Sequence, residues 1–213
     1  MAELICLANS IRHDGRCVAG IDVESGGWVR PVESPGSGVA TSKVFIGGNE
    51  LALLDVFEVP LLNDPLNDKY QRENRLIGRG AWRITGRVAP EDLLPFCEED
   101  TVVLHNHSDR VSPDYLENLG QAEWKSLQLV HSRDVRFERD YYDRNRWRAS
   151  FEDGSGHHLY LKITDLVASD RLRTGDDLAS ECILTVSLAG PWAPPDGQQE
   201  ERCYKLVAGV IEL

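Results

Sequence analysis

Arginine and aromatic side chains are the residues of this sequence whose types and spacing could bind a ligand. Residues 69–87 hold six basic residues against a single acid, Glu73, together with two aromatic rings. Rings stack on nucleobases and guanidinium groups bind phosphates, a combination typical of single-stranded nucleic-acid binding. The side chains of this predicted site are Tyr70, Arg72, Arg75, Arg79 and Trp82. The alternative is that the acidic stretch 89–125 neutralises these arginines.

A second pair extends the predicted site. Trp28 and Arg30 stand two residues apart in WVRPV, and alternate residues of a strand share one face. Arg16 is expected on the facing strand of the same hairpin. We therefore include Trp28 and Arg30 among the ligand-binding residues, against the alternative that Trp28 packs in a core while Arg30 is solvated.

Residues 133–148 carry six arginines, four acids, Tyr141, Tyr142 and Trp147. Because the charges nearly balance, this stretch predicts surface ion pairs rather than a binding site.

Catalytic and metal-binding motifs are absent from the sequence. It contains no GxGxxG, P-loop, GxSxG or HExxH pattern. His105 and His107 in HNHSD could form a pair of metal ligands, but metal sites usually need three or four ligands and the sequence gives no partner. We predict no catalytic residue, no metal and no cofactor.

Composition describes an ordinary globular chain with a strongly acidic balance. The 213 residues are 41% hydrophobic and carry a net charge of -12, which repels polyanions at long range. The five cysteines form no CxxC pair, which favours reduced thiols. The start of the chain does not resemble a signal peptide, and no apolar run reaches the roughly 18 residues of a membrane span. These features predict a cytoplasmic protein without membrane contact.

The elements that must position these residues are mostly strands. The strand pattern of residues 1–88 predicts an N-terminal OB-like barrel. Residues 89–126 are expected to form an acidic helical connector, with helices that start near Pro90 and at Ser112. Residues 127–213 predict five strands, with a helix near 166–172 between the third and the fourth. This order is that of an OB-fold, a small five-stranded barrel. The expected strands are 4–8, 16–23, 28–32, 51–62, 81–88, 127–137, 147–152, 158–164, 182–188 and 203–211.

Several phrases of the sequence together resemble a family of prokaryotic dual OB-fold domain proteins. They are ICLANS, GRCVAGID, WVRPV, LDVFEVPL, YQREN, HLYLKITD and CYKLVAGVIEL, and they span nearly the whole chain. The resemblance implies a mainly β protein with two OB-like barrels, and binding of nucleic acid by analogy with other OB-folds. It implies no catalytic residue.

The sequence therefore predicts a non-catalytic binding module for single-stranded DNA or RNA, or for a nucleotide-like ligand. Two alternatives stay open. The acidic surface would suit an accessory subunit that binds a partner protein, and an enzyme without a familiar motif is the third class.

Overall fold

The computed structural model divides the chain into two compact units. It describes residues 1–12, 15–66, 68, 70–97, 101–194 and 200–213, except the side chains of residues 63–65. The first unit comprises Met1–Asp68 and Arg72–Leu93, and the second comprises Lys69–Gln71 and Leu94–Leu213. The stretch expected as a connector is thus shared: its first residues belong to the first unit and the rest to the second.

The first unit is a five-stranded barrel in which two strands are interrupted. Its first three strands are antiparallel neighbours, the third pairs parallel with the fifth, and the fourth returns beside the first. The fourth strand breaks at Pro60, which has no N–H to donate to the ladder. The five strands in chain order are β1 (Ala2–Arg12), β2 (Gly15–Asp22), β3 (Trp28–Val32), β6 with β7 (Asp55–Val59, Leu61–Pro65) and β8 with β9 (Asn74–Ile77, Arg83–Arg87). A 3-10 turn η1 (Thr41–Lys43) and a small hairpin, β4 (Phe45–Ile46) and β5 (Asn49–Glu50), join the third strand to the fourth.

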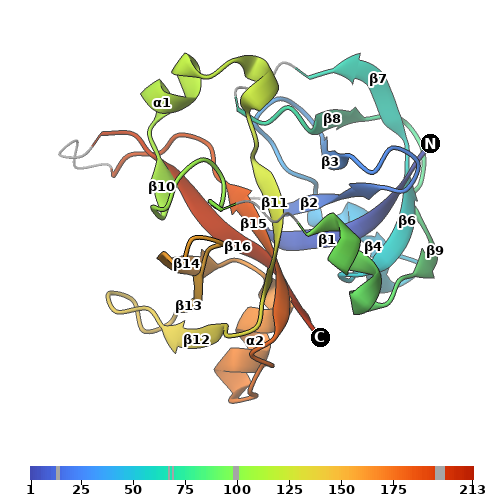
Figure 1. Ribbon diagram of the computed structural model, residues 1–213. Coiled ribbons are helices and arrows are strands. Elements are labelled where there is room, and N and C mark those ends of the chain that lie inside the picture. Colours follow the sequence, from blue (N-terminus) through green and yellow to red (C-terminus); the bar gives the residue numbers. More distant parts are fainter. Residues whose placement is uncertain (13–14, 67, 69, 98–100, 195–199) are drawn as a thin grey trace. The chain divides into compact units, whose positions relative to one another are not determined.

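The second unit repeats this pairing pattern. Its strands are β11 (Leu127–Ser132) with β12 (Arg136–Arg139), β13 (Trp147–Glu152), β14 (His158–Ile163), β15 (Cys182–Leu188) and β16 (Cys203–Glu212). The third strand again pairs parallel with the fifth, and the first closes the ring by pairing with the fourth through β11 and with the second through β12. Within this unit, Figure 1 shows the long β15 and β16 side by side. The predicted mainly β architecture of two OB-like barrels is confirmed.

An expected strand of the second unit is also broken in the structure. Residues 127–137 read as a single strand, but the ladder stops after Ser132 and resumes at Arg136. Between them, buried Val135 donates its N–H to the carbonyl of Ser180 at 2.9 Å. The break turns the strand, so that its halves pair with opposite neighbours.

Short helices follow the capping signals of the sequence. Helix α1 (Pro113–Asn118) begins after Ser112, whose hydroxyl accepts from the Tyr115 N–H, and α2 (Leu166–Thr174) begins after Asp165, which accepts from the Ala168 N–H. The helix expected near 166–172 is therefore confirmed. At the helix start expected near Pro90, the chain forms the 3-10 helix η2 (Pro90–Phe96). Another 3-10 turn, η3 (Gln121–Glu123), follows α1. No helix in the described part of the chain is long and apolar enough to cross a membrane.

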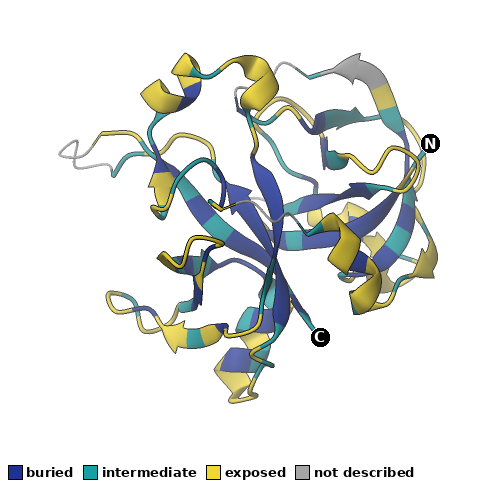
Figure 2. Ribbon diagram, in the orientation of Figure 1, coloured by how far each residue is buried: buried dark blue, intermediate teal, exposed yellow. Residues whose placement is uncertain are grey.

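Each unit has its own apolar core. Leu4, Phe57 and Val59 lie in the first core, and Phe151, Leu161 and Val207 lie in the second. Figure 2 shows the buried residues concentrated along the strands, whereas the short helices and connecting loops are mostly exposed. Each barrel therefore holds a rigid strand framework from which loops and outer strand faces can present ligand-binding side chains.

Candidate functional site

Arg30, a residue of the predicted site, is buried on β3 of the first unit. Its side chain is only 1% exposed, and its guanidinium forms an ion pair at 3.0 Å with the carboxylate of Glu73, which is 8% exposed. The Arg30 N–H also donates to the Glu73 carbonyl at 2.9 Å. This pair joins β3 to the start of β8, so Arg30 has a structural role there. Trp28, two residues before, is half-buried.

The two aromatic residues of the 69–87 stretch are also buried. Trp82 is 8% exposed and stacks on Phe57 with ring centroids 5.4 Å apart, in the first core. Tyr70 is 2% exposed, contacts Trp124 edge-on and shares a 3.0 Å hydrogen bond with Glu117 in the second unit. Both rings pack in cores, where an intact fold leaves no face open for a base.

The arginines of the same stretch lie nearer the surface. Arg72 and Arg79 are exposed, while Arg75 is half-buried and donates to the carbonyls of Arg72 and Asn74 at 2.6 and 2.8 Å. Lys69, the basic residue at the start of this stretch, lies outside the described residues. The structure thus separates the predicted set into surface guanidinium groups and core rings, and the role of Arg72, Arg75 and Arg79 in binding stays a prediction.

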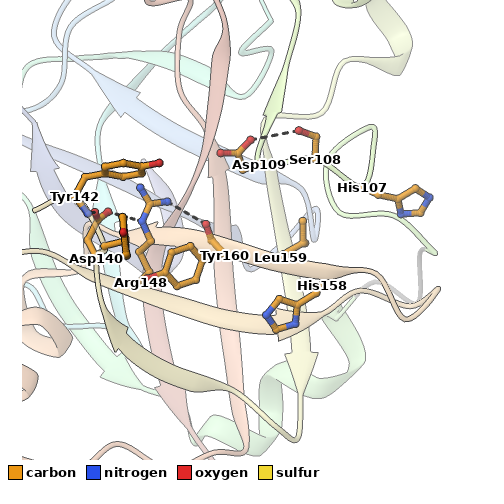
Figure 3. A pocket seen from close by; sticks show the side chains of 10 residues that line it. His107, Ser108, Asp109, Asp140, Tyr142, Arg148, His158, Leu159 and Tyr160 are labelled. Carbon is orange, nitrogen blue, oxygen red and sulfur yellow. Dashed lines mark hydrogen bonds and ion pairs between the residues drawn. The ribbon is translucent and has the colours of Figure 1, made fainter.

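A cavity of about 410 Å³ opens on the second barrel (Figure 3). It lies over β13 and β14, the second and third strands of this barrel, between the 140–146 loop and residues 107–109. In Figure 3, Tyr142 and Arg148 lie at one end of the cavity and His107 at the other. OB-folds bind oligonucleotides and oligosaccharides on this face and with the adjoining loop. The lining residues are His107, Ser108, Asp109, Asp140, Tyr141, Tyr142, Arg148, His158, Leu159 and Tyr160.

Asp140 organises the loop at one end of the cavity. Its carboxylate is almost fully buried and accepts from the N–H groups of Tyr142 and Asp143 at 2.8 and 3.1 Å, and it forms an ion pair with Arg148. Burial favours the neutral acid, but the hydrogen bonds from Arg148 and from the two backbone N–H groups outweigh it and hold the pKa of Asp140 below its ordinary value. The loop conformation is therefore fixed by an ionised carboxylate.

Arg148 and Tyr160 form the floor beside this loop. The guanidinium carbon of Arg148 lies 5.0 Å from the centre of the Tyr160 ring, and Arg148 donates to the Tyr160 carbonyl at 3.1 Å. The Tyr160 hydroxyl donates to the Arg139 carbonyl at 3.1 Å, and burial raises the pKa of this phenol. Both side chains are thus held in place before any ligand arrives.

Two tyrosines project from the fixed loop. Tyr141 is 75% exposed and Tyr142 is 91% exposed, and their rings meet edge to face at 5.1 Å. Beyond them, the guanidinium of Arg139 lies 4.1 Å above the Trp147 ring. Large aromatic rings are costly to leave in water, so this exposed pair beside a cavity is a candidate binding surface.

The connection between β15 and β16 also exposes an aromatic ring. Trp192 is 53% exposed and lies edge-on to Tyr204 at 5.9 Å, held by backbone hydrogen bonds with Arg202. In OB-folds this connection, between the fourth and fifth strands, also contacts ligands. The barrel therefore presents aromatic rings from the two loops that contact ligands in other OB-folds.

The sequence prediction missed these residues because it weighed charge alone in residues 133–148. The predicted ion pairs are present: Arg136 with Asp134, Arg146 with Asp143, and Arg148 with Asp140. Arg133 pairs with the more distant Glu181 at 3.5 Å. The available signal was the Tyr141-Tyr142 dipeptide in the turn between the first two strands of the barrel.

Comparison with known proteins supports the architecture. No curated protein and no solved structure gives a significant match to this chain. A family model described as the dual OB-containing domain matches residues 2–210, nearly the full length. With the shared strand order of the two barrels, this match shows that the chain belongs to the dual OB-containing domain family.

Proposed function

We propose that this binding module takes single-stranded nucleic acid on the second barrel, across the cavity over β13 and β14. The exposed Tyr141–Tyr142 pair on a loop fixed by Asp140 carries the proposal. Base stacking on aromatic rings contributes roughly 1–3 kcal/mol per base and is tolerant of sequence. The alternative of an accessory subunit for a partner protein rests only on the acidic net charge.

The charge distribution explains why stacking rather than Coulomb attraction would dominate. Asp109 and Asp140 line the cavity, and Arg148 is paired with Asp140. Among the described residues, Arg139 and Arg144 on the same loop region form no ion pair with a carboxylate. These two guanidinium groups would supply the phosphate contacts at this cavity. We therefore expect modest affinity with a small dependence on salt.

The direct test is a titration of fluorescently labelled oligo-dT and oligo-U at low salt. Replacing Tyr141 or Tyr142 with alanine should weaken binding by about 5-fold to 150-fold, the equivalent of one lost stacking contact. Tyr115→Ala is the matched control, because Tyr115 is exposed on α1 of the same unit and does not line the cavity. It should leave affinity unchanged.

A second pair of variants tests the phosphate contacts. Arg144→Ala should lower the slope of log affinity against log salt by about 0.7, the contribution of one phosphate contact to a single strand. Arg133→Ala, which removes an exposed arginine paired with Glu181, should not change the slope. If neither oligonucleotide binds more tightly than about 0.1 mM, the nucleic-acid proposal fails and the partner-protein alternative replaces it.

A further inference from the structure

Three side chains that could ligate a metal ion lie together at the edge of the cavity in the second unit. His107, Asp153 and His157 each offer one ligand atom, and these atoms lie within 4.8 Å of one another. His107 Nδ1 is 2.6 Å from Asp153 Oδ2, and His157 Nδ1 is 3.7 Å from Asp153 Oδ1. The two imidazole rings are stacked, with centroids 3.8 Å apart and planes 22° from parallel.

We propose that His107, Asp153 and His157 bind a divalent transition-metal ion of the zinc class through the two Nδ1 atoms and a carboxylate oxygen. Two imidazoles and one carboxylate are a ligand set that zinc and its neighbours accept, with a further position left for water or substrate. The side chains of His107 and His157 are 39% and 55% exposed, so that position faces solvent.

The carboxylate of this cluster is built into the fold. Asp153 has no exposed side-chain surface, and its Oδ1 accepts from the N–H groups of Ser155 and His157 at 2.9 and 3.0 Å. These bonds orient the carboxylate within the turn between β13 and β14. Oδ2 is directed to His107, which comes from a segment 46 residues earlier in the chain. A buried carboxylate that faces two imidazoles is already arranged as a ligand.

The segment that carries His107 is fixed independently. Lys205 on β16 is 2% exposed and donates from Nζ to the carbonyls of Val103 and Asn106, both at 2.6 Å, and to the Asn106 side chain at 2.8 Å. Leu104 has a left-handed backbone, with φ of 43°, which persists only where surrounding contacts impose it. His107 therefore reaches Asp153 from a held position.

The distances fit a metal once the imidazole stack of His107 and His157 opens, because each Nδ1 lone pair lies in its own ring plane. Zinc takes nitrogen and oxygen ligands at about 2.0–2.2 Å, which puts tetrahedral ligand atoms about 3.4 Å apart. The 2.6 Å contact between His107 and Asp153 must open by less than about 1 Å, and the half-exposed His157 ring must turn out of its stack on His107 to point Nδ1 at the ion. Sequence reasoning predicted no metal because it paired His107 with His105. His105 instead contacts the Lys125 carbonyl, at 2.8 Å.

The experiment measures metal binding by the intact chain without any oligonucleotide, so its result is independent of the proposed function. Titration calorimetry with Zn²⁺ should give one ion per chain. His107→Gln and His157→Gln should each weaken binding by at least about tenfold, the loss caused by removing even an outer partner of a ligating histidine. His131→Gln is the matched control, since His131 also pairs with a carboxylate, Glu181 at 3.0 Å, and lies outside the cluster. The His131→Gln variant should bind Zn²⁺ with the affinity of the wild type.

Cobalt distinguishes this site from a cysteine site. Co²⁺ bound here should lack the near-ultraviolet thiolate charge-transfer band and should broaden the imidazole NMR signals of His107 and His157. Cys97→Ser, which removes the partly exposed cysteine of the second unit, should change neither result. The proposal is overturned if the wild type fails to bind Zn²⁺, if both glutamine variants bind as tightly as the wild type, or if Cys97→Ser abolishes binding.

Discussion

The buried ion pair between Arg30 and Glu73 gives the sharpest test of how the first barrel is held together. The two side chains are 1% and 8% exposed and join the third strand to the fifth. Replacing Arg30 with methionine preserves most of the side-chain volume but leaves the Glu73 carboxylate buried without this cation. Removing one partner of a buried pair typically costs about 3–5 kcal/mol, a large fraction of a total stability of about 5–15 kcal/mol.

Arg83→Met is the matched control. Arg83 pairs with Glu58 at 2.8 Å in the same unit, but its side chain is 71% exposed. Exposed pairs contribute about 0–1 kcal/mol, so this variant should be nearly neutral. The two pairs have the same residue types and similar N–O distances, and they differ most in burial.

The assay is urea unfolding followed by tryptophan fluorescence and by circular dichroism. With an m-value of about 2 kcal/mol/M, Arg30→Met should lower the midpoint by about 2 M. Trp82, packed on Phe57 in the same core, reports on this unit. The double variant with methionine at positions 30 and 73 should recover more than half of the loss, because apolar replacement removes both desolvation costs. The reasoning is refuted if Arg30→Met behaves like Arg83→Met, or if the double variant is no more stable than the single one.

Three further predictions follow from burial and charge. Trp82→Ala should cost about 3–5 kcal/mol in the same urea assay, because it leaves a cavity beside Phe57; a loss below about 1 kcal/mol would contradict its core position. The pKa of Asp140 is lower in the folded protein than its unfolded value of about 4. The ionised carboxylate therefore stabilises the fold above about pH 4, and this stabilisation is lost as the pH falls through the folded pKa. Asp140→Asn should accordingly make the melting temperature less dependent on pH below about pH 4. If Arg72 and Arg79 contact phosphates, their joint replacement by alanine should lower the salt slope of oligonucleotide binding by about 1.4, and an unchanged slope would exclude them from the site.

Local patterns determined the elements of this protein from sequence. Alternating apolar residues predicted most strands of the second barrel, and the Asp165 cap predicted the helix between its third and fourth strands. Ser112 likewise marked the start of α1. Capping and strand alternation depend on neighbours within a few residues, so they can be read without the fold. The strand order then limited the architecture to OB-like barrels.

Tertiary structure decided which side chains could reach a ligand. Arg30 and Trp82 looked like surface residues because charge and aromaticity are visible in sequence, whereas burial against Glu73 or Phe57 depends on strand pairing. The His107–Asp153 contact joins segments 46 residues apart for the same reason. Sequence spacing fixes which side chains share a strand face, but only barrel closure determines which of those faces turn inward and which loops meet above the sheet.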